Sequence, residues 1–229
     1  PLGLNKNMRP ENMLMLSRTL GAFLLILVVA STTSATEKFV VGKDFEQISP
    51  IVKTQTENGK VEVVELFWYG CSHCFAFETE ISVWEKQKSE FIEFRRVPAI
   101  FDRKWVSHAR AYYTAEKLGV TKIVHPKLFE ALHTKKQRIY TETELADFFE
   151  SIGVGKEDFT AAYTSFEVDT LTRKAMALTR SYGIGGVPSM IVAGKFRSSV
   201  RHAGSSKNLL NVIDFLAHRE LKMDTKLSP

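Results

Sequence analysis

The chain has 229 residues, of which 44% are hydrophobic and 25% charged, enough for one large domain or two small ones. Its 31 basic and 26 acidic residues leave a formal net charge of +5, and the basic residues are dispersed among acidic ones. Because nucleic-acid-binding proteins concentrate Lys and Arg in one patch, this composition gives no support for nucleic-acid binding.

The first 35 residues differ in composition from the rest of the chain. Arg9 and Arg18 precede an apolar run over residues 20–30, and small residues follow it up to Ala35. A basic start, a short apolar core and a small-residue end are typical of a secretory signal peptide. The core is shorter than the roughly twenty residues of a membrane-spanning helix, which makes an uncleaved anchor the weaker alternative. We expect residues 1–35 to be removed on export, and the true start to be Met8, Met13 or Met15.

Short apolar stretches predict the first strands of the mature chain. Residues 38–41 are a short strand candidate, and a turn-prone stretch follows. The run 61–69 has almost no polar interruption, which is typical of a central strand covered on both faces. A helical stretch comes next, and residues 91–97 are another strand candidate. Strand, helix and strand predict a parallel βαβ unit with a right-handed crossover.

The segment from about 104 to 182 has helical periodicity throughout. Thr141 and Glu144 form a capping-box pattern, and Gly153 and Gly183 are placed to end helices. Apolar side chains recur along one face of each predicted helix, and we expect these stripes to be buried. The stripes are Trp105, Ala109, Tyr112 and Tyr113; Ile123, Val124, Leu128, Phe129 and Leu132; Leu145, Phe148, Phe149 and Ile152; Phe159, Ala162, Tyr163 and Phe166; and Leu171, Ala175, Leu178 and Tyr182.

The last part of the chain returns to β structure. Residues 189–193 are a strand candidate, Gly194 and Lys195 predict a hairpin turn, and Phe196 begins the next strand. A closing amphipathic helix carries Leu209, Val212, Ile213 and Leu216. The sequence therefore predicts an α/β fold in which a βαβ unit and a ββα unit form one sheet, with four or five helices inserted between them.

The chain has only two cysteines, Cys71 and Cys74, and Ser72 and His73 separate them. They follow the predicted strand 61–69, which places Cys71 at the start of the next helix. Free backbone N–H groups and the helix dipole favour a thiolate there. A reactive thiolate with a second cysteine nearby is suited to thiol–disulfide exchange. In an exported chain that has no other cysteine, this pair indicates a chemical role rather than a structural crosslink.

Other interpretations of the pair have less support. A zinc site normally needs four ligands, and the sequence has no second cysteine pair and no paired histidine spacing. A structural disulfide here would close a loop of only four residues and so stabilise little. A soft-metal chaperone is a third interpretation, with Cys71, His73 and Cys74 holding an ion such as Cu(I) and only Met190 as a further ligand that folding could bring close. A binding module would not need the pair.

These features resemble the thioredoxin fold, and the inserted helices make the chain similar to the DsbA family of periplasmic thiol:disulfide oxidoreductases, in its gamma-proteobacterial type. The resemblance covers roughly residues 39–221. It is carried by the stretch from Val64 to Cys74 and by Gly186-Val187-Pro188 ahead of a strand and hairpin. It implies a thioredoxin-fold domain in two parts, 36–103 and 176–229, with an all-helical domain inserted at 104–175.

The resemblance implies an enzyme, a dithiol oxidase that introduces disulfide bonds into exported proteins in the periplasm. It implies no cofactor and no metal beyond the redox-active Cys71–Cys74 disulfide. Its partners would be reduced or unfolded exported proteins and, for reoxidation, a DsbB-like quinone-linked membrane protein. We expect a monomer. A disulfide isomerase or reductase is the alternative, although isomerases of this compartment generally carry a separate dimerisation domain that is not visible in this sequence.

We expect Cys71 to be the nucleophile and Cys74 the buried partner. His73 is expected to stabilise the Cys71 thiolate through a hydrogen bond or its positive charge. Ser72 stands where the family usually has proline, and this departure leaves the strength of the oxidant open.

Glu65 is an acid within an apolar strand, so it either faces a polar pocket or has a raised pKa, unless it lies at an exposed edge. By resemblance it is the buried acid that handles protons near Cys74, and Glu62 is the weaker candidate. The resemblance also implies a cis peptide bond at Pro188 that faces the cysteines, although an X-Pro bond is trans by default. The backbone of Val187 and Gly186 would then pair with an extended substrate.

Overall fold

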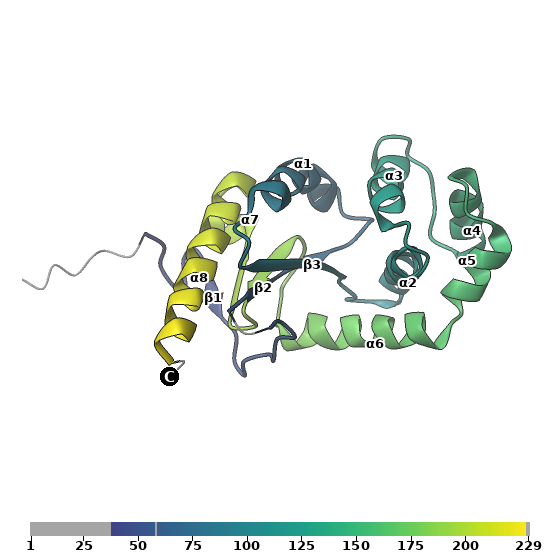
Figure 1. Ribbon diagram of the computed structural model, residues 1–229. Helices are drawn as coiled ribbons and strands as arrows, with labels where there is room; N and C mark the ends of the chain where they lie inside the picture. Colours follow the sequence, from purple (N-terminus) through teal and green to yellow (C-terminus); the bar gives the residue numbers. More distant parts are fainter. Residues whose placement is uncertain (1–37, 58, 228–229) are drawn as a thin grey trace, which may run out of the picture. The chain divides into compact units, whose positions relative to one another are not determined.

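The computed structural model describes residues 38–57 and 59–227 of the chain (Figure 1). The expected signal peptide, residues 1–35, and the candidate start methionines lie outside these residues. Within the described part of the chain, no helix combines the length and the apolar character that crossing a membrane requires.

Five strands form one mixed sheet in the order β1-β5-β4-β2-β3. The strands are β1 (Glu46–Gln47), β2 (Val61–Phe67), β3 (Ile92–Pro98), β4 (Ser189–Val192) and β5 (Phe196–Ser199). β2 runs parallel to β3, and α1 (Ser72–Gln87) connects them, as the sequence predicts. β4 runs antiparallel to β2 on its other side, with Met190 opposite Glu65.

The central strand β2 is buried along its whole length and separates two apolar layers. Val61 and Val63 pack with buried residues of α1 and of α8 (Ser206–Leu227). Val64 and Leu66 point to the opposite face because side chains alternate along a strand, and they join the core shared with the inserted helices. Figure 1 shows α1 and α6 (Phe166–Ser181) on opposite sides of the strands. Coverage of both faces explains why the β2 sequence has so few polar residues.

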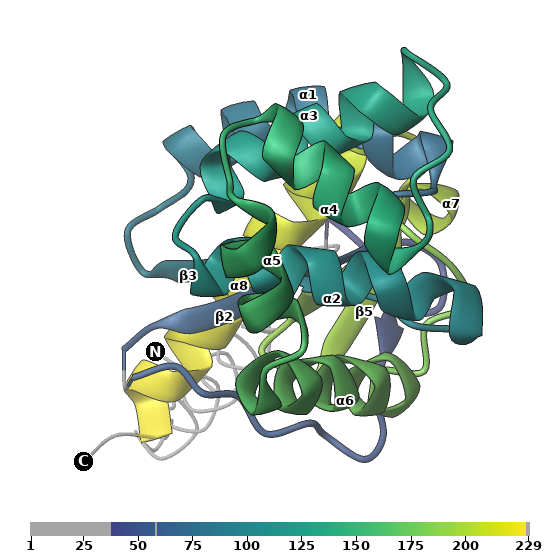
Figure 2. The same ribbon diagram turned by 90° about the vertical axis from the view of Figure 1, so that its right-hand side faces the viewer.

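Five helices follow β3 before the chain returns to the sheet, and Figure 2 shows this block from its own side. They are α2 (Arg103–Lys117), α3 (Thr121–His133), α4 (Glu142–Ser151), α5 (Lys156–Tyr163) and α6. The predicted capping box is confirmed at α4, because the Thr141 hydroxyl accepts from the Glu144 N–H and the Glu144 carboxylate accepts from the Thr141 N–H. A short helix α7 (Val200–Ala203) then precedes α8.

The predicted strand at 38–41 is wrong. Val41 makes only an isolated bridge to Phe45, because Gly42 turns the chain with φ +82° and the Asp44 carboxylate accepts a hydrogen bond from the Val40 N–H. The edge strand begins later, at Glu46, where it pairs with β5. The strand predicted to reach residue 69 ends at Phe67.

Two residues of the predicted apolar stripes are exposed rather than buried. Phe166 is 87% exposed because Ser165 caps a new helix there, so Phe166 does not continue the buried face of α5. Ile123 is 48% exposed at the first turn of α3. Periodicity alone does not show where one helix stops and the next begins, and the interruption at Ser165 changes which face is buried.

The predicted turn residues Gly194 and Lys195 lie in the hairpin loop between β4 and β5, which begins one residue earlier than predicted, at Ala193; Ala193 and Gly194 both have positive φ. The expected domain boundary at residue 175 lies inside α6, which continues to Ser181. Residues from Phe39 onward form one compact unit, so the division into 36–103, 104–175 and 176–229 stays a prediction.

Candidate active site

The two cysteines lie where β2 leads into α1. Cys71 is the N-cap of α1 with extended backbone angles, and its N–H donates to the Trp68 carbonyl at 3.0 Å. Gly70 is needed in this connection, because a Cβ there would overlap the Trp68 ring. Both cysteines are free thiols, with Cys71 partly exposed and Cys74 fully buried. One sulfur is thus open to solvent and the other, one turn along, is not.

The two thiols have opposite pKa shifts. The pKa of Cys71 is lowered to about 6, chiefly because the Cys74 thiol donates a hydrogen bond to the Cys71 sulfur, while burial opposes the change. The backbone N–H groups of Cys74 and His73 lower it further, and the charge of His73 adds a smaller effect. Burial, followed by the hydrogen bond to Cys71, raises the pKa of Cys74 well above its usual value. The accessible sulfur is therefore the one that ionises at neutral pH.

His73 and Ser72 are both exposed on the first turn of α1. The His73 side chain makes no hydrogen bond to any residue that the structure describes. Of the two effects expected for this imidazole, only the electrostatic one acts on the Cys71 sulfur, and it is weaker than the effect of Cys74. In the thiol state Cys71 makes no side-chain capping hydrogen bond.

The segment before β4 faces the cysteines. The Val187–Pro188 peptide bond is cis, which confirms the expectation from the family resemblance. The Cys71 thiol donates to the Val187 carbonyl at 3.5 Å, across 116 positions of sequence. Val187 is partly exposed and Gly186 is exposed, whereas Pro188 is buried. The Gly186 carbonyl accepts from the Ser189 hydroxyl at 2.7 Å, which fixes the segment next to the reactive sulfur.

Glu65 is fully buried on β2, so an exposed edge position is wrong. Burial raises the pKa of its carboxyl group, and the neighbouring Arg96 guanidinium opposes the change, leaving a value of about 8. Arg96 Nε lies 3.1 Å from Glu65 Oε2, yet the pair is not aligned as a hydrogen bond, and both carboxylate oxygens lack a hydrogen-bond donor among the described residues. The Glu65 charge also contributes to the raised pKa of Cys74.

Glu62, the weaker candidate, is 2% exposed and forms an ion pair with Arg95, whose Nε lies 2.9 Å from Oε2. It lies three residues before Glu65 on β2, so the two side chains point to opposite faces of the sheet. Glu65 is the acid on the face of α1, and Glu62 belongs to the other layer.

A buried polar chain beside the cysteines has no counterpart in the sequence analysis. The Tyr69 hydroxyl lies 2.9 Å from His125 Nδ1, and His125 Nε2 lies 3.2 Å from a Glu78 carboxylate oxygen. His133 Nε2 donates to the Tyr69 carbonyl at 2.7 Å. His125 and His133 flank Phe129 at four-residue intervals, so they share one face of α3. That spacing was the available signal, since histidines within an apolar stripe need buried partners.

A partly exposed cysteine that ionises readily, a buried second cysteine and a cis-proline segment against them define a thiol:disulfide oxidoreductase site on a thioredoxin-like fold. Among the described residues, no three or more His, Cys, Asp or Glu side chains are grouped so that they could hold a metal ion.

Comparison with known proteins gives the family. Residues 62–211 match the DSBA-like thioredoxin domain. The chain is 38% identical over 207 residues to the thiol:disulfide interchange protein DsbA of Azotobacter vinelandii, covering 85% of this chain and 97% of that protein. It is 37% identical over 201 residues to DsbA of Pseudomonas aeruginosa, covering 88% and 95%.

Solved structures agree with this match. The crystal structure of Pseudomonas aeruginosa DsbA has a TM-score of 0.79 at 37% identity, over 83% of this chain and 98% of that one. DsbA from Xylella fastidiosa has a TM-score of 0.74 at 32% identity, over 80% and 97%. The chain therefore belongs to the DSBA-like thioredoxin domain family. It is a thiol:disulfide oxidoreductase of the disulfide-introducing kind, and neither the metal chaperone nor the isomerase alternative is favoured.

Proposed function

We propose that this enzyme oxidises reduced polypeptides exported to the periplasm, with the Cys71–Cys74 disulfide as the oxidant. The observation that carries the proposal is the contrast between the two thiols: Cys71 is accessible with a pKa of about 6, and Cys74 is buried with a raised pKa. A stabilised thiolate in the reduced enzyme makes its disulfide oxidising, an effect for which DsbA enzymes are themselves the known example.

The reaction proceeds in two exchanges. A substrate thiolate attacks Cys71 Sγ, the Cys71–Cys74 bond breaks, and a mixed disulfide forms while Cys74 leaves as a thiolate and takes up a proton. A second substrate thiolate then attacks the substrate sulfur of the mixed disulfide. The substrate gains its disulfide, Cys71 leaves as a thiolate, and two electrons have passed to the enzyme.

Glu65 is proposed to exchange the proton that Cys74 takes up. A carboxyl with a pKa of about 8 still holds a proton at neutral pH, and the burial of Cys74 favours the thiol over the thiolate. His73 is proposed to add positive charge near the Cys71 sulfur. Ser72, exposed beside them, is proposed to contact substrate.

Substrate binding is proposed at the Val187 segment. Gly186 is exposed and Val187 partly exposed next to Cys71, where an extended chain can pair with their backbone. Backbone pairing gives affinity that depends little on side chains, which suits an enzyme with many substrates. Pro188, buried behind them, holds the segment against the cysteines.

The remaining assignments rest on the family and on the expected signal peptide. We propose a periplasmic location and reoxidation by a DsbB-like membrane protein. The chain is proposed to act as a monomer without a cofactor, because the cysteine pair itself carries both electrons.

Trapping the mixed disulfide tests the proposal. Cys74→Ala should accumulate complexes with reduced exported proteins through Cys71, and Cys71→Ala should abolish oxidation and trapping. Mass spectrometry of periplasmic extracts identifies both the linked cysteine and the linked protein. Complexes formed mainly through Cys74 in Cys71→Ala would reverse the roles. A potential close to that of disulfide isomerases, measured by glutathione equilibration, would favour isomerase function instead.

A further inference from the structure

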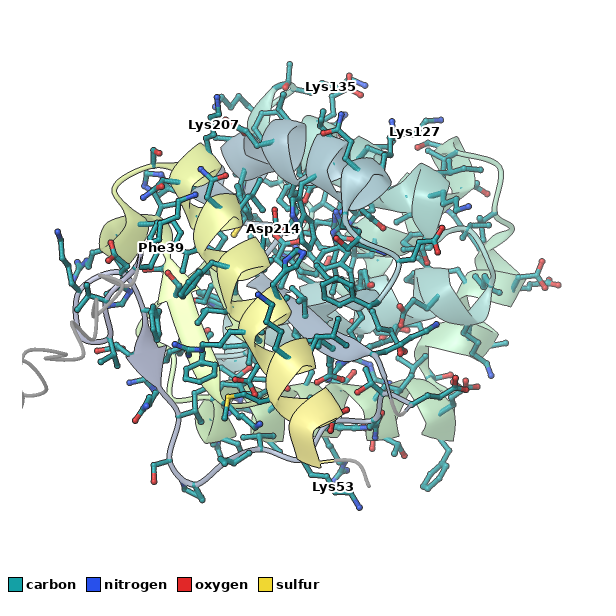
Figure 3. The ribbon with its side chains drawn as sticks, turned by 60° about the vertical axis from the view of Figure 1, so that its left-hand side comes forward. Phe39, Lys53, Lys127, Lys135, Lys207 and Asp214 are labelled. Atoms are coloured by element: carbon teal, nitrogen blue, oxygen red, sulfur yellow. The ribbon has the colours of Figure 1, made fainter. Side chains whose placement is uncertain are left out.

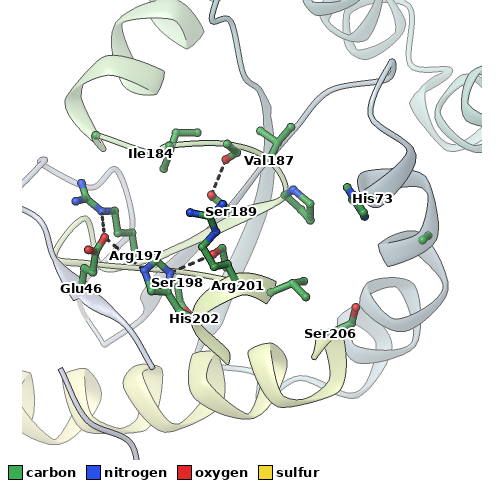
Figure 4. Close-up of a pocket in the computed structure, with 17 residues that line it drawn as sticks. Glu46, His73, Ile184, Val187, Ser189, Arg197, Ser198, Arg201, His202 and Ser206 are labelled. Atoms are coloured by element: carbon green, nitrogen blue, oxygen red, sulfur yellow. Dashed lines mark hydrogen bonds and ion pairs between the residues drawn. The ribbon is translucent and has the colours of Figure 1, made fainter. Parts of the chain in front are cut away.

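A pocket of about 680 Å³ lies between the Val187 segment and His73, the residues next to the reactive cysteine in space and in sequence (Figure 4). The segment from Gly183 to Ser189 forms one wall, β5 and α7 form another, and His73 lies at the side of α1. Val187, whose carbonyl accepts from the Cys71 thiol, is part of the lining. A polypeptide joined to Cys71 and paired with Val187 therefore has neighbouring side chains within reach of this pocket.

Most charged groups of the pocket are already paired. Arg197 Nε lies 2.8 Å from a Glu46 carboxylate oxygen, and another Arg197 nitrogen donates to the Tyr182 carbonyl at 2.9 Å. His202 lies 3.0 Å from the Ser199 hydroxyl and 3.8 Å from Glu46. Glu46 is the only acid in the lining, and Arg197 occupies it.

Arg201 is not paired in this way. It is exposed on α7, lines the pocket, and makes no ion pair or hydrogen bond to any residue that the structure describes. A guanidinium stays charged at every accessible pH and presents donors suited to a carboxylate. Besides the His73 imidazole, the pocket thus has one permanent positive charge without an ion-pair partner among the described residues, beside apolar lining from Val187, Pro188 and Val200.

We propose that Arg201 is a specificity residue: it binds an acidic side chain of the reduced polypeptide, so that cysteines with a nearby Asp or Glu are oxidised faster. The inference rests on the proposed function and goes beyond it, since backbone pairing at Val187 carries no side-chain preference. A single exposed charge gives a modest and reversible contact, which suits a substrate that must leave after oxidation.

The test uses reduced peptides that share one sequence with a cysteine pair, in which one Glu is moved through the four positions on either side of the first cysteine. Each peptide has a Gln counterpart. kcat/KM is measured at low salt for the natural chain, Arg201→Gln, Arg201→Lys and Lys207→Gln. Lys207 is the matched control, because it is exposed at the start of α8, outside the pocket lining (Figure 3).

At one or more positions the natural chain should oxidise the Glu peptide about three-fold faster or more than the Gln peptide, a difference of the size expected for an exposed ion pair. Arg201→Gln should remove the preference, whereas Arg201→Lys and Lys207→Gln should keep it. Equal rates for Glu and Gln peptides at all positions would overturn the proposal, as would a preference that survives Arg201→Gln or is lost equally in Lys207→Gln. Failure of every variant to oxidise any peptide would instead refute the proposed function.

Discussion

At the scale of single residues, the activity depends on which groups surround the Cys71 sulfur. The order of the residues around the cysteine pair correctly predicts an accessible first thiol and a buried second one. His73, at the second helical position, extends into solvent and acts on the sulfur through its charge, whereas the buried Cys74 thiol lies against the sulfur and has the larger effect. The hydrogen bond within the pair therefore matters more than the residue between its members.

The larger effect of Cys74 than of His73 on the sulfur predicts the order of the Cys71 pKa values among variants. Cys74→Ala removes the principal donor and should raise the pKa of Cys71 clearly, whereas Cys74→Ser retains a hydroxyl donor and should raise it less. His73→Ser should also raise it, by less than Cys74→Ala. Thiolate absorbance titrations measure all three, with Ser72→Ala as the control. A larger rise in His73→Ser than in Cys74→Ala would show that the imidazole charge dominates.

The raised pKa of Glu65 makes stability depend on pH. The folded protein holds this proton up to about pH 8, while an unfolded Glu loses it near 4.3. The favourable contribution is therefore complete below about pH 4 and is lost as the pH rises through about 8. Glu65→Gln cannot ionise, so its stability relative to the natural chain should rise over that interval, by up to about 1.4 kcal/mol per pH unit.

Urea unfolding between pH 5 and pH 8.5 measures this change. Glu93→Gln is the control, because Glu93 is an exposed acid on the adjacent strand β3. Arg96 keeps Glu85 as a partner at 2.9 Å when Glu65 is neutral, which limits the cost of the substitution. A stability difference that does not vary with pH would mean that Glu65 is ionised throughout, held by Arg96.

At the scale of helices and strands, close contacts decide where a residue type is replaceable. Gly194 and Gly204 both have positive φ, +63° and +81°, so alanine is strained at either position. Of these two glycines, only Gly194 would place a Cβ into another part of the chain, the carbonyl of Val52. The Val52 N–H donates to the Gly194 carbonyl at 3.1 Å. Nothing lies within 4 Å of a Cβ at Gly204.

Gly204→Ala should therefore lower the free energy of unfolding by about 1–2 kcal/mol, the cost of the left-handed backbone alone. Gly194→Ala should lower it by at least about 1 kcal/mol more, because the hairpin must move away from Val52. Chemical denaturation of both variants measures the difference. Equal losses would show that the Val52 segment moves aside without cost.

The elements that the sequence predicts well are those whose pattern reflects local geometry. The burial of β2, α1 and β3 imposes apolar runs on the strands and a helical repeat on α1. The α4 cap is an exchange of hydrogen bonds between residues three apart. The failures arise where remote contacts decide. Residues 38–41 have strand-like composition, but only the segment at Glu46 reaches β5. The Tyr69–His125–Glu78 chain joins three separate parts of the chain, so the histidine spacing in α3 indicates buried partners but does not identify them.

At the scale of the whole molecule, the inserted helices and the sheet meet at the active site. His125 and His133 on α3 contact the side chain and the carbonyl of Tyr69, two residues before Cys71. On the other side, Trp84 Nε1 of α1 donates to Asp214 of α8 at 2.8 Å, with Asp214 labelled in Figure 3. The segment that carries the cysteines is thus held by both layers, and a change in the cysteine pair acts on the stability of the whole fold.

The last prediction concerns how that stability differs between the two redox forms. In the reduced protein Cys71 has a pKa of about 6, while in the unfolded chain a free thiol has about 8.5. A lowered pKa stabilises the fold fully above the unfolded value, and the stabilisation is lost as the pH falls through about 6. The oxidised protein has no such thiol, and the effect of its short disulfide loop on the unfolded chain does not depend on pH.

The stability of the reduced form minus that of the oxidised form should therefore increase between about pH 6 and pH 8.5 and be constant below pH 6. The slope cannot exceed about 1.4 kcal/mol per pH unit, the value for one proton. Cys74, whose pKa is raised, opposes the trend only above about pH 8.5, so measurements stop there. Guanidinium unfolding of both redox forms at each pH gives the difference, and reduced Cys71→Ser should lack the rise. A difference that stays flat from pH 6 to 8.5 would mean that the Cys71 thiol is not stabilised as an anion, and that the oxidising power of the pair has another source.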